Sequence, residues 1–316
     1  MRIHQYIFLK ITTFAHYQSL AKIMHSGQTD DKNSAFSKPL RFENNGISFT
    51  GKSPVIMGIL NVTPDSFFDG GRYSDEESLI QQTKKMLADG ADLVDIGAVS
   101  TRPGAKIPDS NSETDRLLPV IRLLKNEIPG IRISVDTFRT SVAEKMISEG
   151  VLMINDISGG TFDDKMADFI GENDIPYVLM HIHDRPETMQ RNPIGIKDLQ
   201  SVIQFIENQI RIFTSKGANQ LITDPGFGFG KTVGLNYHLL SHLSYFKDLG
   251  YPVLVGISRK SMINKILNNS PNEALNGTTV LNTLALTQGA DILRVHDVKE
   301  AHEARSLWQQ FVQPAD

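Results

Sequence analysis

The chain has 316 residues, of which 40% are hydrophobic and 22% are charged, a composition typical of a globular protein with a large buried core. Its formal net charge of −4 argues against a nucleic-acid partner, which usually requires a basic surface. The sequence has no cysteine, which excludes a disulfide scaffold and thiolate-ligated zinc and fits a reducing compartment. Without an apolar run of about 18 residues, no membrane span is expected. We therefore expect a cytoplasmic protein.

The first 39 residues are predicted to form a flexible extension. The apolar stretch 6–9 is followed by Lys10 and lacks a small-residue cleavage site, which argues against a signal peptide. Residues 26–38 are polar and typical of disorder, and Met24 is an alternative start. Residues 40–49 then alternate around Asn44-Asn-Gly46, which predicts a β-hairpin at the floor of the following domain.

From residue 55 onward, short apolar runs alternate with amphipathic segments. Strands are predicted over 55–60, 91–96, 131–135, 151–154, 176–180, 221–223, 251–255 and 291–295. Helices are predicted over 76–89, 113–127, 138–148, 163–172, 197–215, 235–248, 273–288 and 301–312. This rhythm predicts an α/β fold, a (β/α)₈ TIM barrel over 40–316 with an N-terminal β-hairpin. A doubly wound open sheet is the alternative, because counting strands cannot show closure.

The first predicted strand ends in chemistry typical of an active-site loop. Val55–Leu60 is apolar and β-branched, as in a strand buried on both faces. It stops at Asn61, and the segments 63–66 (Thr-Pro-Asp-Ser) and 69–71 (Asp-Gly-Gly) are turn sequences. Read alone, this stretch also fits an ordinary strand and loop.

Polar side chains follow almost every predicted strand. In a barrel the carboxyl ends of the strands converge on one mouth, where such enzymes work. For one of these residues, Asp136, a helix N-cap is the plain alternative. The residues concerned are Asn61, Asp95, Asp136, Asn155, Asp156, His181, Asp224, Ser258, Lys260, Arg294 and His296.

The chemistry of this set suggests a ligand with two different ends. Asp136, Asn155 and Asp224 supply hydrogen-bond acceptors, which suit the adjacent N–H groups of an amino-pyrimidinone edge. Arg294 and His296, two residues apart on one strand, would form with Lys260 a cationic flank suited to phosphate. A flat heteroaromatic ring with an anionic tail fits both halves.

Two other motifs have plain explanations. Residues 226–232 (Gly-Phe-Gly-Phe-Gly-Lys-Thr) do not form a P-loop, because four residues must separate the first glycine from Gly-Lys and position 225 is proline. His238 and His242 have the i, i+4 spacing of a zinc site but lack the adjacent glutamate, so we interpret them as helix-surface residues.

Seven segments, in order, resemble the signatures of dihydropteroate synthase, the family that joins a pterin to 4-aminobenzoate in folate synthesis. They are Gly58-Ile-Leu-Asn-Val-Thr-Pro-Asp-Ser-Phe67, Ser100-Thr-Arg-Pro-Gly-Ala105, Ile133-Ser-Val-Asp-Thr137, Asn155-Asp-Ile157, Asp224-Pro-Gly-Phe-Gly-Phe-Gly-Lys231, Gly256-Ile-Ser-Arg-Lys-Ser-Met262 and Arg294-Val-His-Asp297. The resemblance covers almost the whole predicted barrel. It implies small-molecule substrates, a pterin diphosphate and 4-aminobenzoate, with a homodimer as the usual assembly.

The resemblance also implies a role for each matching residue. Asn61 would bind Mg²⁺ bridged to the diphosphate, and Asp136 and Lys260 would be catalytic, Asp136 by stabilising the cationic pterin methylene left when pyrophosphate departs. The pterin ring would be held by Asp136, Asn155, Asp224 and Lys260, and the diphosphate by Thr101, Arg294 and His296. The 4-aminobenzoate site, where sulfonamides bind in this family, would comprise Arg102, Pro103, Phe229 and Ser258.

The sequence departs from the family pattern at two places. Ala98-Val99 stands where the family commonly has Gly-Glu, and Asp184-Arg185 where it usually has a glycine.

Two alternative functions remain open. A pterin-binding barrel without synthase activity, such as the methyltetrahydrofolate-binding domain of corrinoid methyltransferases, would share the pterin acceptors, and so would a catalytically silent paralogue. Thr101-Arg102, Lys260, Arg294 and His296 favour the synthase over a methyl-donor site, because they serve a diphosphate and an arylamine.

Overall fold

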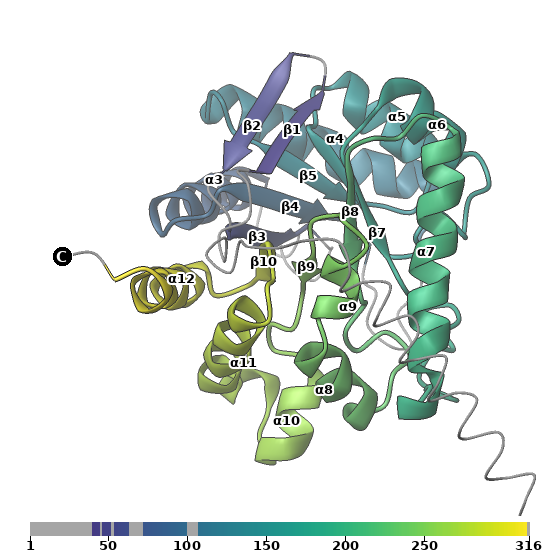
Figure 1. Ribbon diagram of the computed structural model, residues 1–316. Coiled ribbons are helices and arrows are strands. Elements are labelled where there is room, and N and C mark those ends of the chain that lie inside the picture. The colour runs from purple at the N-terminus through teal and green to yellow at the C-terminus, as the bar shows by residue number, and fades with distance from the viewer. Residues whose placement is uncertain (1–39, 45, 52–53, 63–71, 100–106, 315–316) are drawn as a thin grey trace, which may run out of the picture. The chain divides into compact units, whose positions relative to one another are not determined.

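Figure 1 shows the computed structural model of the chain, which describes residues 40–44, 46–51, 54–62, 72–99 and 107–314. The expected flexible extension over residues 1–39 lies outside the described residues. So do most of the loops after the first two core strands, and with them Thr101, Arg102 and Pro103.

The core is a closed barrel of eight parallel strands. Along the sheet the order is β8-β7-β6-β5-β4-β3-β10-β9. A parallel bridge between Thr223 and Val253 joins the two outer strands, with Thr223 N donating to Pro252 O over 2.8 Å. This closure confirms the predicted (β/α)₈ barrel over the open sheet. The strands are β3 Val55–Asn61, β4 Leu93–Gly97, β5 Ile133–Asp136, β6 Met153–Asp156, β7 Tyr177–Met180, β8 Leu221–Asp224, β9 Leu254–Val255 and β10 Ile292–Val295.

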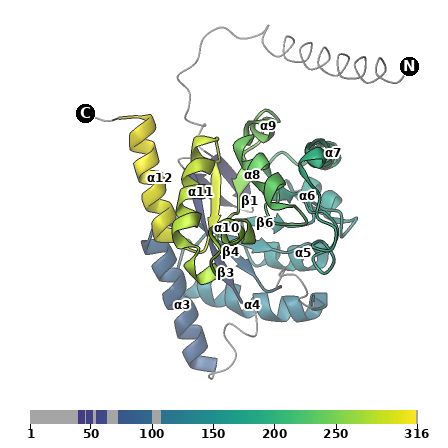
Figure 2. The ribbon, with the colours of Figure 1, turned by 90° about the horizontal axis from the view of Figure 1, so that it is seen from below.

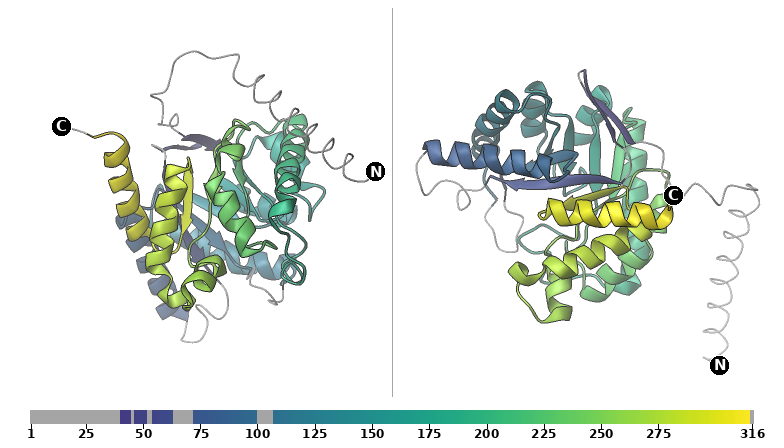
Figure 3. Two further views of the ribbon diagram at one scale, coloured as in Figure 1. Left: turned by 60° about the horizontal axis from the view of Figure 1, so that its bottom comes forward. Right: turned by 90° about the vertical axis from the view of Figure 1, so that its left-hand side faces the viewer.

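Helices connect successive strands and surround the barrel (Figure 2). The right-hand view of Figure 3 shows α3 and α12 on either side of β3. The helices are α3 Arg72–Ala88, α4 Ser110–Glu127, α5 Thr140–Ser148, α6 Met166–Asn173, α7 Leu199–Ser215, α8 Val233–Ser241, α9 Ser244–Lys247, α10 Ser261–Leu267, α11 Leu275–Thr287 and α12 Val298–Val312, with short 3₁₀ turns η1 Ile196–Asp198 and η2 Pro271–Glu273. None of the described helices is long and apolar enough to cross a membrane.

Two apolar layers hold the barrel together. The larger layer lies between the strands and the helices and includes Leu117 of α4, Phe213 of α7 and Phe246 of α9, all fully buried. The smaller layer fills the barrel interior with side chains from alternate strand positions, such as Met57, Leu93 and Ile222. Because β-branched and other apolar residues face both layers, the strands read as continuous apolar runs.

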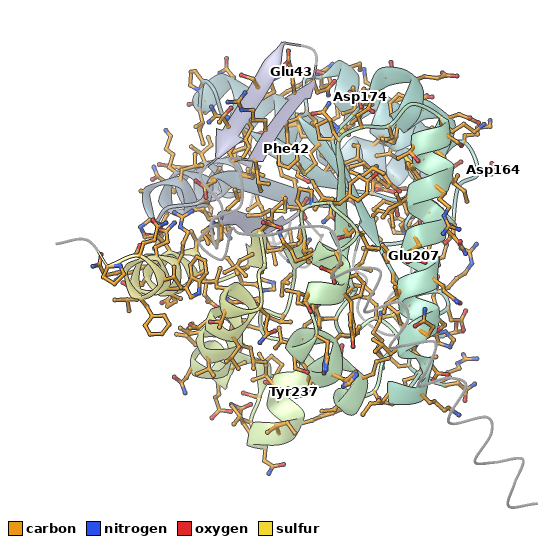
Figure 4. All side chains as sticks on the ribbon, in the orientation of Figure 1. Phe42, Glu43, Asp164, Asp174, Glu207 and Tyr237 are labelled. Carbon is orange, nitrogen blue, oxygen red and sulfur yellow. The ribbon has the colours of Figure 1, made fainter. Side chains whose placement is uncertain are left out.

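The predicted hairpin closes the amino-terminal end of the barrel. Strands β1 Leu40–Asn44 and β2 Ile47–Gly51 pair antiparallel, and Phe42 and Phe49 belong to the interior layer, with ring centroids 6.0 Å apart. Gln220, which precedes β8, exchanges two hydrogen bonds with the backbone of Glu43, at 2.8 and 2.9 Å. Figure 4 labels Phe42 and Glu43 on the hairpin, near Asp174. The open mouth is therefore at the opposite, carboxyl end of the strands.

Candidate active site

A cluster of four polar side chains occupies the centre of the mouth. Arg294 of β10 donates from Nε to Asp95 Oδ2 (2.7 Å) and from Nη2 to Asp136 Oδ2 (3.0 Å). Asn155 of β6 donates from Nδ2 to the same Asp95 oxygen, over 2.9 Å. Because adjacent parallel strands present equivalent positions side by side, these residues converge although they are up to 199 positions apart in sequence.

Asp95 has one carboxylate oxygen that no described residue engages. Its side chain is fully buried in β4, yet Oδ1 has no hydrogen-bond partner within the described part of the chain. A buried acceptor without a donor is costly, so the free oxygen is suited to a ligand N–H group. The sequence placed Asp95 at the mouth but assigned it no role. The sequence feature that could have indicated a role for Asp95 is its charge inside an otherwise apolar strand, Leu93-Val-Asp-Ile96.

The carboxyl group of Asp136 changes its protonation state near pH 7. Burial raises its pKa to about 7, against the opposing charge of Arg294, while the neighbouring carboxylate of Asp95 adds to the increase. The helix-cap alternative for Asp136 is wrong, because α5 begins after Arg139 and its first amide, that of Thr140, donates to Asp163. Asp136 instead faces Arg294.

A second group of contacts surrounds Asp224 and Lys260. Asp224 Oδ1 accepts from Gly226 N over 2.7 Å, and Oδ2 has no hydrogen bond to a described residue. Lys260 Nζ donates to Phe227 O and lies 4.6 Å from the centre of the Phe229 ring. Burial lowers the pKa of Lys260 to about 8, against the opposing charge of Asp224.

His296 and Ser258 form the rim beside this group. Ser258 Oγ lies 3.2 Å from His296 N, which donates to it, and 3.1 Å from His296 Nδ1. Desolvation and the positive charge of Arg294 lower the pKa of His296 below its ordinary value. The positive charge of this flank therefore rests mainly on Arg294 and Lys260.

Two side-chain oxygens, from Asn61 and Asp136, lie near Gly97 at the end of β4. A Cβ placed on Gly97 would lie 3.8 Å from Asn61 Oδ1 and 3.7 Å from Asp136 Oδ2. Both distances are ordinary van der Waals contacts, so the two side-chain oxygens lie on the same side of Gly97. Hard oxygen donors of this kind suit Mg²⁺, which usually takes one or two protein ligands and keeps several waters. Among the described residues, no group of three or more histidine, aspartate or glutamate side chains forms a metal site.

Two other buried polar residues near the mouth, Asp156 and His181, make their contacts with the protein itself. The carboxylate of Asp156 accepts from Tyr177 OH (2.6 Å), Ser158 N (2.7 Å) and Gly160 N (3.1 Å), so its hydrogen bonds go to the protein. His181 is buried against Phe205, and burial lowers its pKa to about 2. The contacts described for both residues are therefore made within the protein.

The departures from the family pattern have visible local consequences. Ala98 is fully buried, and its carbonyl accepts from Arg116 Nη1 over 3.2 Å. Asp184 has φ of 67°, the left-handed conformation that favours glycine, and its Oδ1 accepts from Arg185 N. Asp184 thus keeps the backbone shape of a glycine turn.

The fold and the mouth together define a class of protein, a TIM-barrel enzyme whose strand ends bring buried carboxylates and cations to one mouth. The sequence profile of the family described as pterin binding enzyme matches residues 57–296. A dihydropteroate synthase of Synechocystis sp. is 43% identical over 267 residues, covering 82% of this chain and 92% of the relative.

Solved structures agree with this comparison. A Yersinia pestis dihydropteroate synthase in a sulfonamide drug complex has 37% identity and a TM-score of 0.79, covering 86% of this chain and 99% of that one. A Xanthomonas albilineans dihydropteroate synthase with 4-aminobenzoic acid has 35% identity and a TM-score of 0.80, covering 88% and 100%. The chain belongs to the pterin-binding enzymes, in the dihydropteroate synthase family.

Proposed function

We propose that the chain catalyses dihydropteroate synthesis, a transferase reaction of folate biosynthesis. It would condense (7,8-dihydropterin-6-yl)methyl diphosphate with 4-aminobenzoate, giving 7,8-dihydropteroate and pyrophosphate. The observation that carries this proposal is the row of buried acceptors at the mouth, in which Asp95 Oδ1 has no donor among the described residues and Asp224 Oδ2 accepts from none of them. A pterin edge supplies adjacent N–H groups for such oxygens.

The pterin ring would lie among Asp95, Asp136, Asn155, Asp224 and Lys260. Heterolysis of the pterin methylene C–O bond sends the electron pair to pyrophosphate and leaves a cationic methylene. The amine nitrogen of 4-aminobenzoate then forms the new C–N bond and releases a proton. A negative charge on Asp136 would stabilise the cation without a covalent intermediate, as a fixed electrostatic group in a poorly hydrated site.

Arg294 and His296, with Thr101, would bind the diphosphate. In the free protein the Arg294 guanidinium is paired with Asp95 and Asp136, so the bound diphosphate would share it with those carboxylates. Mg²⁺ would be held by Asn61, and when bound it neutralises charge on the departing pyrophosphate. The oxygen donors facing Gly97 support this assignment.

The 4-aminobenzoate would lie against Phe229 and Ser258, together with Arg102 and Pro103. Phe229 supports this assignment because its ring packs near the cationic end of Lys260, at the edge of the pterin acceptors. By this proposal the same subsite would also take sulfonamides, the class of drug bound in the Yersinia pestis structure.

One assay separates this function from its alternatives. Pyrophosphate release from the pterin diphosphate is measured with and without 4-aminobenzoate and Mg²⁺. Release that depends on the arylamine supports the synthase. No release, with tight binding of methyltetrahydrofolate, would indicate a methyltransferase-type barrel. Pterin binding without either property would indicate a silent pterin-binding protein.

We also infer a cytoplasmic homodimer. Exposed apolar side chains on the neighbouring helices α11 and α12 support self-association, since such patches usually mark interfaces. Val280 and Leu284 are 50% and 48% exposed, and Leu307 and Phe311 are 74% and 79% exposed. Sedimentation of the wild type and of a Leu284→Asp variant tests the assembly, because a monomeric wild type would contradict it.

A further inference from the structure

Lys231 is a buried lysine that the proposed chemistry does not use. Its side chain follows the loop 225–230 between β8 and α8, and the residue is only 4% exposed. The ammonium donates to three backbone carbonyls, those of Gly226 (2.8 Å), His181 (3.1 Å) and Phe229 (3.2 Å). An ammonium has three N–H donors, so this arrangement satisfies every one of them.

These three carbonyls belong to two different segments of the mouth. Gly226 and Phe229 lie in the loop after β8, whereas His181 follows β7. The two segments touch closely, because a Cβ on Gly226 would lie 1.9 Å from His181 O and one on Gly230 would lie 2.4 Å from His183 O. Lys231 therefore ties the loop 225–230 to the neighbouring strand end at its tightest point.

The same loop presents groups to the proposed substrate sites. Its Phe227 carbonyl accepts from Lys260 Nζ, and its Phe229 ring lies 4.6 Å from that same nitrogen. Other hydrogen bonds join the loop to neighbouring segments: Gly228 N donates to Asn236 Oδ1 of α8 (2.7 Å), Gln190 Nε2 donates to Gly228 O (2.7 Å), and Ile194 N donates to Gly230 O (2.9 Å). The position of the Phe229 ring thus depends on how firmly the loop backbone is held.

We infer that Lys231 is a positioning residue, which fixes the loop 225–230 so that the Phe229 ring is held in the proposed arylamine subsite, beside Lys260. The inference rests on the proposed function. The acceptors assigned to the pterin belong to the strands themselves, Asp95 to β4, Asp136 to β5, Asn155 to β6 and Asp224 to β8, so they are held mainly by the barrel. Loss of the Lys231 ammonium should therefore impair the arylamine much more than the pterin.

The test replaces Lys231 by methionine, an unbranched side chain one atom shorter, which keeps the apolar stem and removes the donors. We expect Lys231→Met to raise KM for 4-aminobenzoate by roughly ten- to a hundredfold while KM for the pterin diphosphate changes much less, because small displacements of positioning groups have effects of this size. Lys231→Gln, which keeps two N–H donors, should give an intermediate value and remains available if the methionine variant folds poorly.

The matched control is Lys247→Met at the other end of the barrel. Lys247 Nζ pairs with Asp291 Oδ2 over 2.6 Å, so its loss perturbs stability without touching the loop. Hydrogen–deuterium exchange should become faster over residues 225–230 in Lys231→Met and stay unchanged there in Lys247→Met.

Three results would overturn the inference, and the first two are unchanged exchange over 225–230 and the same rise in KM for 4-aminobenzoate in both variants. An active wild type whose Lys231→Met variant keeps its KM would overturn it too. A wild type that releases no pyrophosphate would refute the proposed function instead, and exchange over 225–230 would still decide whether Lys231 holds the loop.

Discussion

At the scale of single residues, Asp224 is the pterin acceptor with the simplest expected phenotype. Asp224→Ala should weaken pterin binding by roughly 2–5 kcal/mol, because buried ligand N–H groups lose a charged acceptor. Calorimetric titration with a pterin lacking the diphosphate measures the effect. Asp168→Ala, on the exposed surface of α6, is the control. Wild-type affinity in Asp224→Ala would remove Asp224 from the site.

The pH dependence of turnover follows from two shifted groups. The pKa of Asp136 is raised to about 7, so its stabilising charge is lost as the pH falls below 7. The pKa of Lys260 is lowered to about 8, so its ammonium is lost above that pH. We expect kcat/KM to rise through about pH 7 and fall through about pH 8. Asp136→Asn should abolish the acidic limb, and an unchanged acidic limb would assign it to another group.

Residue types and strand ends were sufficient to predict most of the residues that the structure gathers at the mouth. Asp136, Asn155, Asp224, Lys260 and Arg294 all carry charge or amides directly after apolar runs, which made them conspicuous. The partners of these residues were harder to predict. That Arg294 bridges Asp95 and Asp136, or that Lys231 binds three carbonyls, depends on backbone positions in other strands, which no local pattern specifies.

At the scale of secondary-structure elements, the hairpin provides a stability test that is remote from the mouth. Phe49 is 4% exposed and stacks on Phe42 inside the barrel floor. Phe49→Ala should lower the free energy of unfolding by about 3–5 kcal/mol, because it removes a buried ring and leaves a cavity. Denaturant unfolding measures the loss. KM for both substrates should stay unchanged. A change in either KM would mean that packing at the hairpin affects substrate binding at the mouth.

All eight core strands were predicted because each is a short apolar run between glycine or polar turns. The helices after β8 and β9 were predicted less well. The expected helix over 235–248 is divided into α8 and α9, and α10 was not predicted. α10 has only seven residues, with Ile266 and Leu267 exposed, so it shows no regular apolar face. It ends at Asn268, whose φ of 51° is left-handed.

At the scale of the whole molecule, a buried histidine makes folding sensitive to acid. The pKa of His181 is lowered to about 2, whereas an unfolded histidine titrates near 6.5. Between these values the unfolded chain binds a proton that the native chain does not, so this contribution to stability falls as the pH falls. The stability advantage of the wild type over His181→Gln should shrink by about 1.4 kcal/mol per pH unit from pH 6 to pH 4. A constant difference in unfolding free energy would show that His181 is charged in the native state.

The closed floor and filled interior of the barrel also determine how ligands reach the site. Because apolar side chains fill the barrel interior down to Phe42 and Phe49, substrates reach the strand ends, and products leave them, only through the mouth. Under the proposed assignments the pterin lies deepest, against Asp95 and Asn155, with the arylamine above it, near the rim formed by Ser258 and His296. The pterin diphosphate, which takes the deeper position, must therefore bind before the arylamine. Substrate binding should therefore be ordered, and 4-aminobenzoate that binds first should compete with entry of the pterin diphosphate.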